Sequence, residues 1–77
     1  MLRLKNIKIG HGNAEADFIP EDSNVAGHIV VDLRSEEVVS YDAVPEYGES
    51  YKGHAKMHLI KMAKENDKAT ERIVMWC

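Results

Sequence analysis

The two histidines best placed to act together are His54 and His58, four residues apart in a segment with helical periodicity. On a helix this spacing puts two imidazoles on one face, where both can bind one metal ion. Zinc needs at least a third ligand. The candidates for it are His11, His28 and Cys77. The metalloprotease pattern requires a glutamate directly after the first histidine, and here Ala55 stands in that place. We therefore expect no metal site.

Residues 48–55 contain two glycines at the separation of a phosphate-binding loop, between an expected strand and an expected helix. The Lys-Ser/Thr pair of such a loop is missing, because His54 and Ala55 follow Gly53. Glu49 would also repel a phosphate. Close packing of the first helical turn is the better interpretation of Gly53.

Nucleophilic catalysis would fall to Cys77, the only cysteine, which could act only with a lowered pKa and a positioned base. Its place beside the terminal carboxylate favours neither, so we expect a packed or idle thiol. Asp17, Asp32 and Asp42 alternate with apolar neighbours on expected strands, as solvated side chains do. We therefore expect no enzyme and no cofactor.

Charge is unevenly distributed along the chain, whose net charge is −3. Residues 13–50 carry ten acidic side chains against Arg34 alone, whereas the segments before and after them are basic. The simplest interpretation is that these parts attract one another across the fold, and a free acidic face for a basic partner is the alternative. A pI of about 5.7 and the lack of interleaved aromatic residues argue against nucleic-acid binding.

Four strands are expected before the helix. They span residues 2–9, 14–18, 28–33 and 38–44. In the first, Leu2 and Leu4 alternate with basic residues, but Ile7 and Ile9 have the opposite parity, so we expect a β-bulge near Asn6. A Gly-His-Gly-Asn turn joins the first two strands, because Gly and Asn tolerate positive φ.

From Tyr51 to about Asn66 the apolar residues recur with a period of 3.6, which predicts a helix with Ser50 as its N-cap. Residues 70–77 form the last expected strand. The predicted architecture is a single α+β domain over residues 1–77, a two-layer β-β-β-β-α-β fold. Its sheet is mixed or antiparallel, with the one helix packed on one face.

The last expected strand is apolar on both faces, although a two-layer fold covers only one. The hairpin formed by the third and fourth strands shows the same property. We expect four of these residues to share the uncovered face and to bind a partner: Val30, Val38, Val74 and Trp76. Tryptophan is enriched at interfaces. The alternative is that the N-terminal hairpin folds over this face and buries it within the monomer.

No motif identifies a function. The leading hypothesis is a small non-enzymatic cytoplasmic protein that works through protein–protein contact, as a homodimer or with another protein. A cytoplasmic location is expected because one cysteine forms no intramolecular disulfide, and we expect neither a signal peptide nor a membrane span. One alternative is a small-ligand or metal-binding domain using His54 and His58. Another is an acidic inhibitor of a larger enzyme, with the region from Glu15 to Glu49 as its face.

Overall fold

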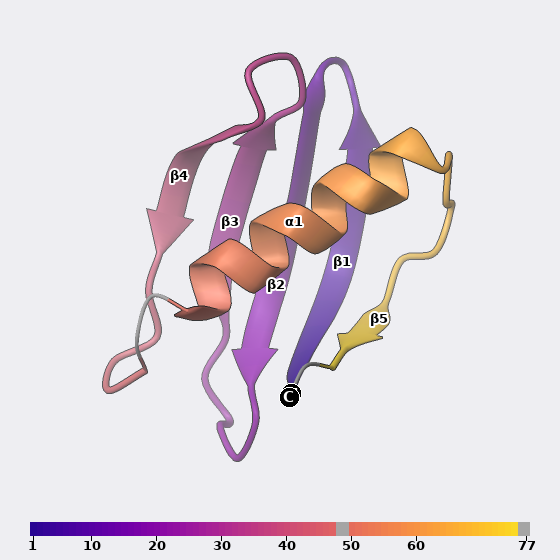
Figure 1. The fold of residues 1–77 in the computed structure, drawn as a ribbon. Coiled ribbons are helices and arrows are strands. Elements are labelled where there is room, and N and C mark those ends of the chain that lie inside the picture. The colour runs from indigo at the N-terminus through magenta and orange to yellow at the C-terminus, as the bar shows by residue number, and fades with distance from the viewer. Residues whose placement is uncertain (48–49, 76–77) are drawn as a thin grey trace.

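The computed structural model describes residues 1–47 and 50–75 of the chain. Its elements follow one another in the order strand, strand, strand, strand, helix, strand (Figure 1). They are β1 (Leu2–Gly10), β2 (Asn13–Pro20), β3 (Gly27–Asp32), β4 (Glu37–Asp42), α1 (Ser50–Lys64) and β5 (Arg72–Val74). The predicted two-layer α+β fold is confirmed, and β5 is shorter than the expected strand over residues 70–77.

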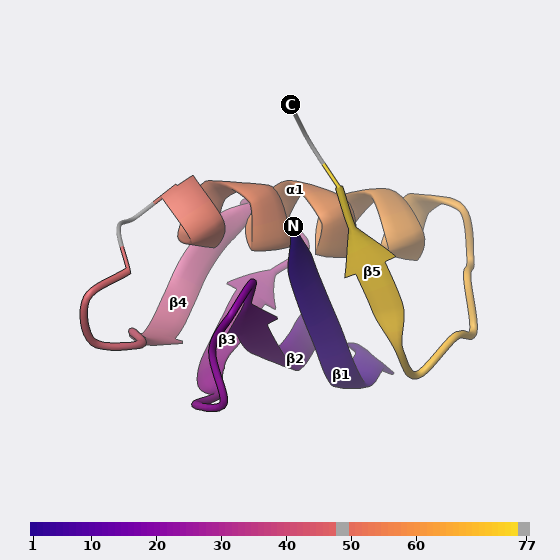
Figure 2. The same cartoon turned by 90° about the horizontal axis from the view of Figure 1, so that it is seen from below.

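The five strands form one sheet in the order β4-β3-β2-β1-β5, and each pairing between neighbours is antiparallel. Helix α1 crosses one face of the sheet and contacts all five strands. Figure 2 shows the sheet curving beneath the helix, and no described element lies on its other side. The N-terminal hairpin of β1 and β2 belongs to the sheet and does not fold over this outer face.

A β-bulge in β1 keeps the strand apolar on the helix side along its whole length. Lys5 lies opposite Asp17 and Lys8 opposite Glu15, so β1 advances by three residues while β2 advances by two. Asn6 takes up the extra residue with a φ of 54°, a conformation that asparagine tolerates well. The bulge expected near Asn6 is therefore confirmed.

The core lies between the sheet and α1. Its buried apolar residues are Leu2, Leu4, Ile7, Ala14, Ala16, Phe18, Ile29, Val31, Val44, Ala55, Leu59, Met62 and Val74. From the helix come Ala55, Leu59 and Met62, whose spacing of four and then three residues keeps them on one face. These three side chains anchor α1 to the sheet.

The helix ends in a Schellman motif. The amide of Asn66 donates to the carbonyl of Ala63 at 3.2 Å, and the amide of Asp67 donates to the carbonyl of Met62 at 2.9 Å. Asn66 has a φ of 56°, as the residue after a helix often does. The motif turns the chain down toward β5. Within the part of the chain that the structure describes, no helix has the length and apolar character needed to cross a membrane.

An aromatic stack between β2 and β4, across β3, ties β4 to the core. The rings of Phe18 and Tyr41 lie parallel, with their centroids 5.3 Å apart. Gly27 lies opposite Phe18 in the pairing of β2 with β3. A Cβ atom at position 27 would overlap the Phe18 ring and the Asp42 carbonyl oxygen. Glycine is therefore required here for the close approach of its neighbours.

Gly27→Ala should lower the free energy of unfolding by about 1–3 kcal/mol, because the added methyl group overpacks the site. The matched control is Gly10→Ala, where a Cβ would meet nothing within 4 Å, and its effect should stay within about 0.5 kcal/mol. Urea unfolding followed by far-UV circular dichroism measures both values. Equal effects of the two substitutions would contradict this account of Gly27.

Candidate functional site

On the outer face, one polar side chain from each of four neighbouring strands forms a row across the sheet. From β1 to β4 the row consists of Lys5, Asp17, His28 and Asp42, each lying opposite the next in the strand register. All four are at least partly exposed. When His28 is protonated, positive and negative charges alternate along the row, the arrangement that stabilises cross-strand pairs.

Asp17 is the hydrogen-bonding centre of the row. Asn6 Nδ2 donates to Asp17 Oδ2 at 2.8 Å, and His28 Nδ1 lies 2.7 Å from Asp17 Oδ1. His28 Nε2 lies 3.7 Å from Glu15 Oε2. Three strands thus supply one polar cluster, which we define as Asn6, Glu15, Asp17 and His28. The β1 bulge supplies its Asn6, so the same irregularity serves both faces of the sheet.

The cluster shifts two titrations in opposite directions. Hydrogen bonds from Asn6 and then from His28 lower the pKa of Asp17. The hydrogen bond to Asp17 raises the pKa of His28. Partial burial lowers this pKa, but the charges of Asp17 and Glu15 raise it further. Both shifts favour the charged pair. The protonated histidine and the ionised carboxylate therefore coexist over a wider pH range than they would if the two residues did not interact.

An Asp–His pair of this kind orients an imidazole, as the orienting carboxylate does in a catalytic triad. Among residues 1–47 and 50–75, no hydrogen bond joins His28 to a hydroxyl or a thiol. The same part of the chain contains no group of three or more His, Cys, Asp or Glu side chains able to hold a metal ion. What the described geometry supplies is a charged surface that carries an oriented imidazole.

The structure does not bring together the three predicted interface residues that it describes, Val30, Val38 and Val74. Val30 lies on the outer face, opposite Glu15 of β2. Val74 is 7% exposed and sits in the core opposite Leu2, so its expected place on the outer face is wrong. The two faces of β5 are thus the reverse of the expected ones. Ile73, which is 57% exposed, points away from the helix, and Val74 points toward it. Trp76 lies outside the described residues.

Val38 is also placed on the other side from the one expected. A register shift between β3 and β4 pairs Val30 with Ser40 but Val31 with Val38, so Val39 is an extra residue. This bulge turns Val38 toward the core, against which it packs, and leaves Val39 59% exposed. A part for Val30, Val38, Val74 and Trp76 in partner binding stays a prediction, but Val30 is separated from Val38 and Val74.

The two helical histidines are both half-buried on α1. Burial, assisted by the positive charge of Arg72, lowers the pKa of His58. This favours the neutral imidazole. The expectation of no metal site stays a prediction, and metal or ligand binding by His54 and His58 stays its alternative.

Acidic residues of the middle segment are spread over the molecule. Glu36 pairs with Lys64 of α1 at 3.1 Å, and Glu21 lies 3.8 Å from the amino terminus. Attraction between the acidic middle and a basic flank is thus visible at the Glu36–Lys64 pair. Glu49, the expected limit of an acidic inhibitory face, lies outside the described residues, as does Cys77.

No protein-family model, curated protein or solved structure matched this chain. The site itself must therefore support any functional proposal.

The Asp17–His28 pair should make stability depend on pH. Because the folded pKa of His28 lies above its ordinary value of 6.5, its stabilisation is fully present below about pH 6.5 and is lost as pH rises through the folded pKa. A double-mutant cycle with Asp17→Asn and His28→Gln should give a coupling free energy that is larger at about pH 5.5 than at about pH 8.

The coupling should be below about 1 kcal/mol, because both side chains are about one-third exposed and solvent screens the pair. Urea unfolding of the four proteins at both pH values measures it. The lowered pKa of Asp17 keeps this carboxylate ionised throughout the window. A coupling that is equal at the two pH values would show that the titration of His28 is not linked to Asp17.

Proposed function

We propose that this protein works without enzymatic activity, through protein–protein contact, and that it pairs with a second copy of itself across the outer sheet face. The supporting observation is the division of charge on that face. Strand β1 carries three basic residues, Arg3, Lys5 and Lys8, and no acidic one. Strand β4, at the opposite side of the sheet, carries Glu37 and Asp42 and no basic residue. Such a surface is complementary to itself.

In a dimer whose two outer faces pack together, a two-fold axis satisfies this complementarity if it lies between the two sheets, parallel to the strands and over the line between β2 and β3. It stacks β1 of one chain on β4 of the other, and β2 on β3, so that each contact occurs twice. In the polar row, Lys5 then faces the partner's Asp42, and Asp17 faces the partner's His28. Opposite charges meet along the whole row, whereas a shift by one strand would bring Asp17 against the partner's Asp42.

The chemistry of the face fits a reversible contact. Apolar side chains on it are few: Val30 and Ile19 are each half-buried within their own chain, and Ile73 is exposed on β5. Electrostatic complementarity contributes mainly to specificity and to the rate of association, and salt screens it. We therefore expect a dimer that weakens strongly with ionic strength. Trp76 stays a predicted contributor.

The acidic-inhibitor alternative is less well supported, because Lys5 and Lys8 lie directly beside the acidic residues of β2. The ligand-binding alternative rests on His54 and His58 alone. We place the protein in a reducing cytoplasm in this proposal, since its single cysteine allows no intramolecular disulfide.

Charge reversal tests the proposed dimer. Asp42→Lys and Lys5→Glu should each weaken self-association by about tenfold or more, because each places like charges opposite one another. The double variant restores opposite charges with their sense exchanged, and so it should recover most of the affinity. Sedimentation velocity over a concentration series measures all four proteins.

Raising NaCl from about 50 mM to about 500 mM should weaken the parent dimer and reduce the differences between the variants. The matched control is Lys56→Glu on α1, which changes the net charge by the same amount as Lys5→Glu but leaves the outer face intact. A parent protein that stays monomeric at millimolar concentration would rule out self-pairing. A double variant as weak as the single ones would rule out this register.

A further inference from the structure

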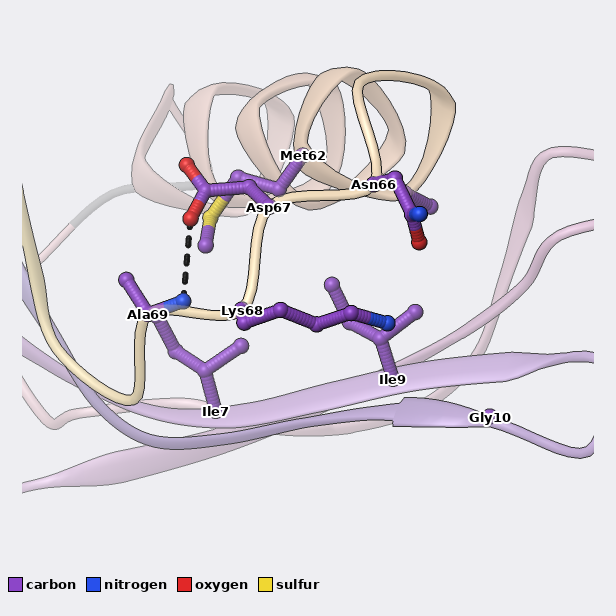
Figure 3. Close-up of a pocket in the computed structure, with 9 residues that line it drawn as sticks. Ile7, Ile9, Gly10, Met62, Asn66, Asp67, Lys68 and Ala69 are labelled. Carbon is purple, nitrogen blue, oxygen red and sulfur yellow. Dashed lines mark hydrogen bonds between the residues drawn. The ribbon is translucent and has the colours of Figure 1, made fainter.

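A second candidate site lies where the end of α1 meets β1, away from the outer face. Figure 3 shows Ile7 and Ile9 projecting from β1 toward the helix end. The cavity between β1 and the end of α1 has a volume of about 400 Å³, within the range of ligand-binding pockets. Among the residues that line it are Ile7, Ile9, Met62, Asn66, Asp67 and Lys68. Its floor is apolar and its rim is polar.

One wall of the cavity is an unpaired strand edge. Strand β1 pairs with β5 only over Leu2–Leu4, and beyond the bulge the Ile7 amide donates to the Thr70 carbonyl at 3.0 Å. Gly10 pairs with Asn13 across the tight turn, so the backbone groups of Gly10 point toward β2. Since hydrogen-bonding direction alternates along a strand, the N–H and C=O of Ile9 point to the open side. They are available to an added strand.

Two polar side chains at the rim have no partner within the described residues. Lys68 makes no ion pair there, and Figure 3 shows its side chain extending toward Ile9, below Asn66. The Asn66 side chain likewise makes no hydrogen bond within this part of the chain. Asp67, by contrast, is occupied, because it accepts hydrogen bonds from the Ala69 amide and from Arg72. The unsatisfied charge at the cavity is thus positive.

We infer that this cavity binds the carboxyl-terminal residue of an extended peptide whose last side chain is apolar. Each part of such a residue has a matching group. The carboxylate meets Lys68 and the Asn66 amide, the side chain enters the space between Ile9 and Met62, and the backbone N–H donates to the Ile9 carbonyl. The peptide thereby extends the sheet beside β1, in line with β5.

A free fatty acid would satisfy Lys68 and the apolar floor but would leave the backbone edge unpaired. This inference does not depend on the proposed dimer, because the cavity lies on the helix side of the sheet. Contacts to one terminal residue are few, so we expect binding in the range from about 100 μM to about 1 mM.

Titration of the full ¹⁵N-labelled chain tests the site, with the peptide Gly-Ser-Thr-Ser-Leu bearing a free carboxylate as the probe. Saturable shifts should centre on the amides of Ile9, Gly10, Asn66 and Lys68. The same peptide with a C-terminal amide should bind at least about tenfold more weakly, because it loses the charge-assisted hydrogen bonds. Replacing its terminal Leu by Gly should weaken binding to a similar degree.

Lys68→Gln should weaken binding of the free-acid peptide by at least about fivefold. Lys64→Gln is the matched control, since Lys64 lies on the last turn of α1, pairs with Glu36 and does not line the cavity. Any of three results on the unmodified chain would overturn the inference: equal binding of the acid and amide peptides, hexanoate binding as tightly as the peptide, or no saturable shift at these amides at several millimolar.

Discussion

A single helix covers five strands, and the rest of the described structure follows from this constraint. Helix α1 shields one face of the sheet, so each strand must be apolar on that face and tolerate solvent on the other. Burial of Ala55, Leu59 and Met62 against the sheet is what holds the two layers together. Because no described element covers the outer face, cross-strand pairs of opposite charge must stabilise it instead.

Much of the fold could be predicted from the sequence because its signals are local. The change of parity at Ile7 predicted the bulge, and the 3.6-residue period predicted α1. The errors came from features that depend on strand pairing. In β4 the extra residue is Val39, and its identity with its neighbour Val38 conceals the shift. In β5 both parities are apolar, so only pairing with Leu2 decides that Val74 is buried.

The candidate sites were less visible, since each joins residues from separate strands. Asp17 looked like an ordinary solvated residue until the register of β2 and β3 placed it beside His28. Asn6 was predicted only as a bulge, although its side chain completes the cluster. The cavity beside Ile9 arises from a mismatch in length, because β5 has three residues and β1 has nine. The sequence predicted that the last strand begins at residue 70, whereas β5 begins at Arg72, and this difference hid the edge.

The strand order also has a consequence for biosynthesis. Strands β1 to β4 form an uninterrupted meander, and α1 follows all of them in the chain. On the ribosome, which synthesises about 5–20 residues per second, the apolar face of this meander emerges seconds before its only described cover. Phe18, Ile29 and Val31 are therefore exposed on the nascent chain while α1 is still being made. Transiently exposed apolar surface of this kind makes a partly synthesised domain prone to aggregate.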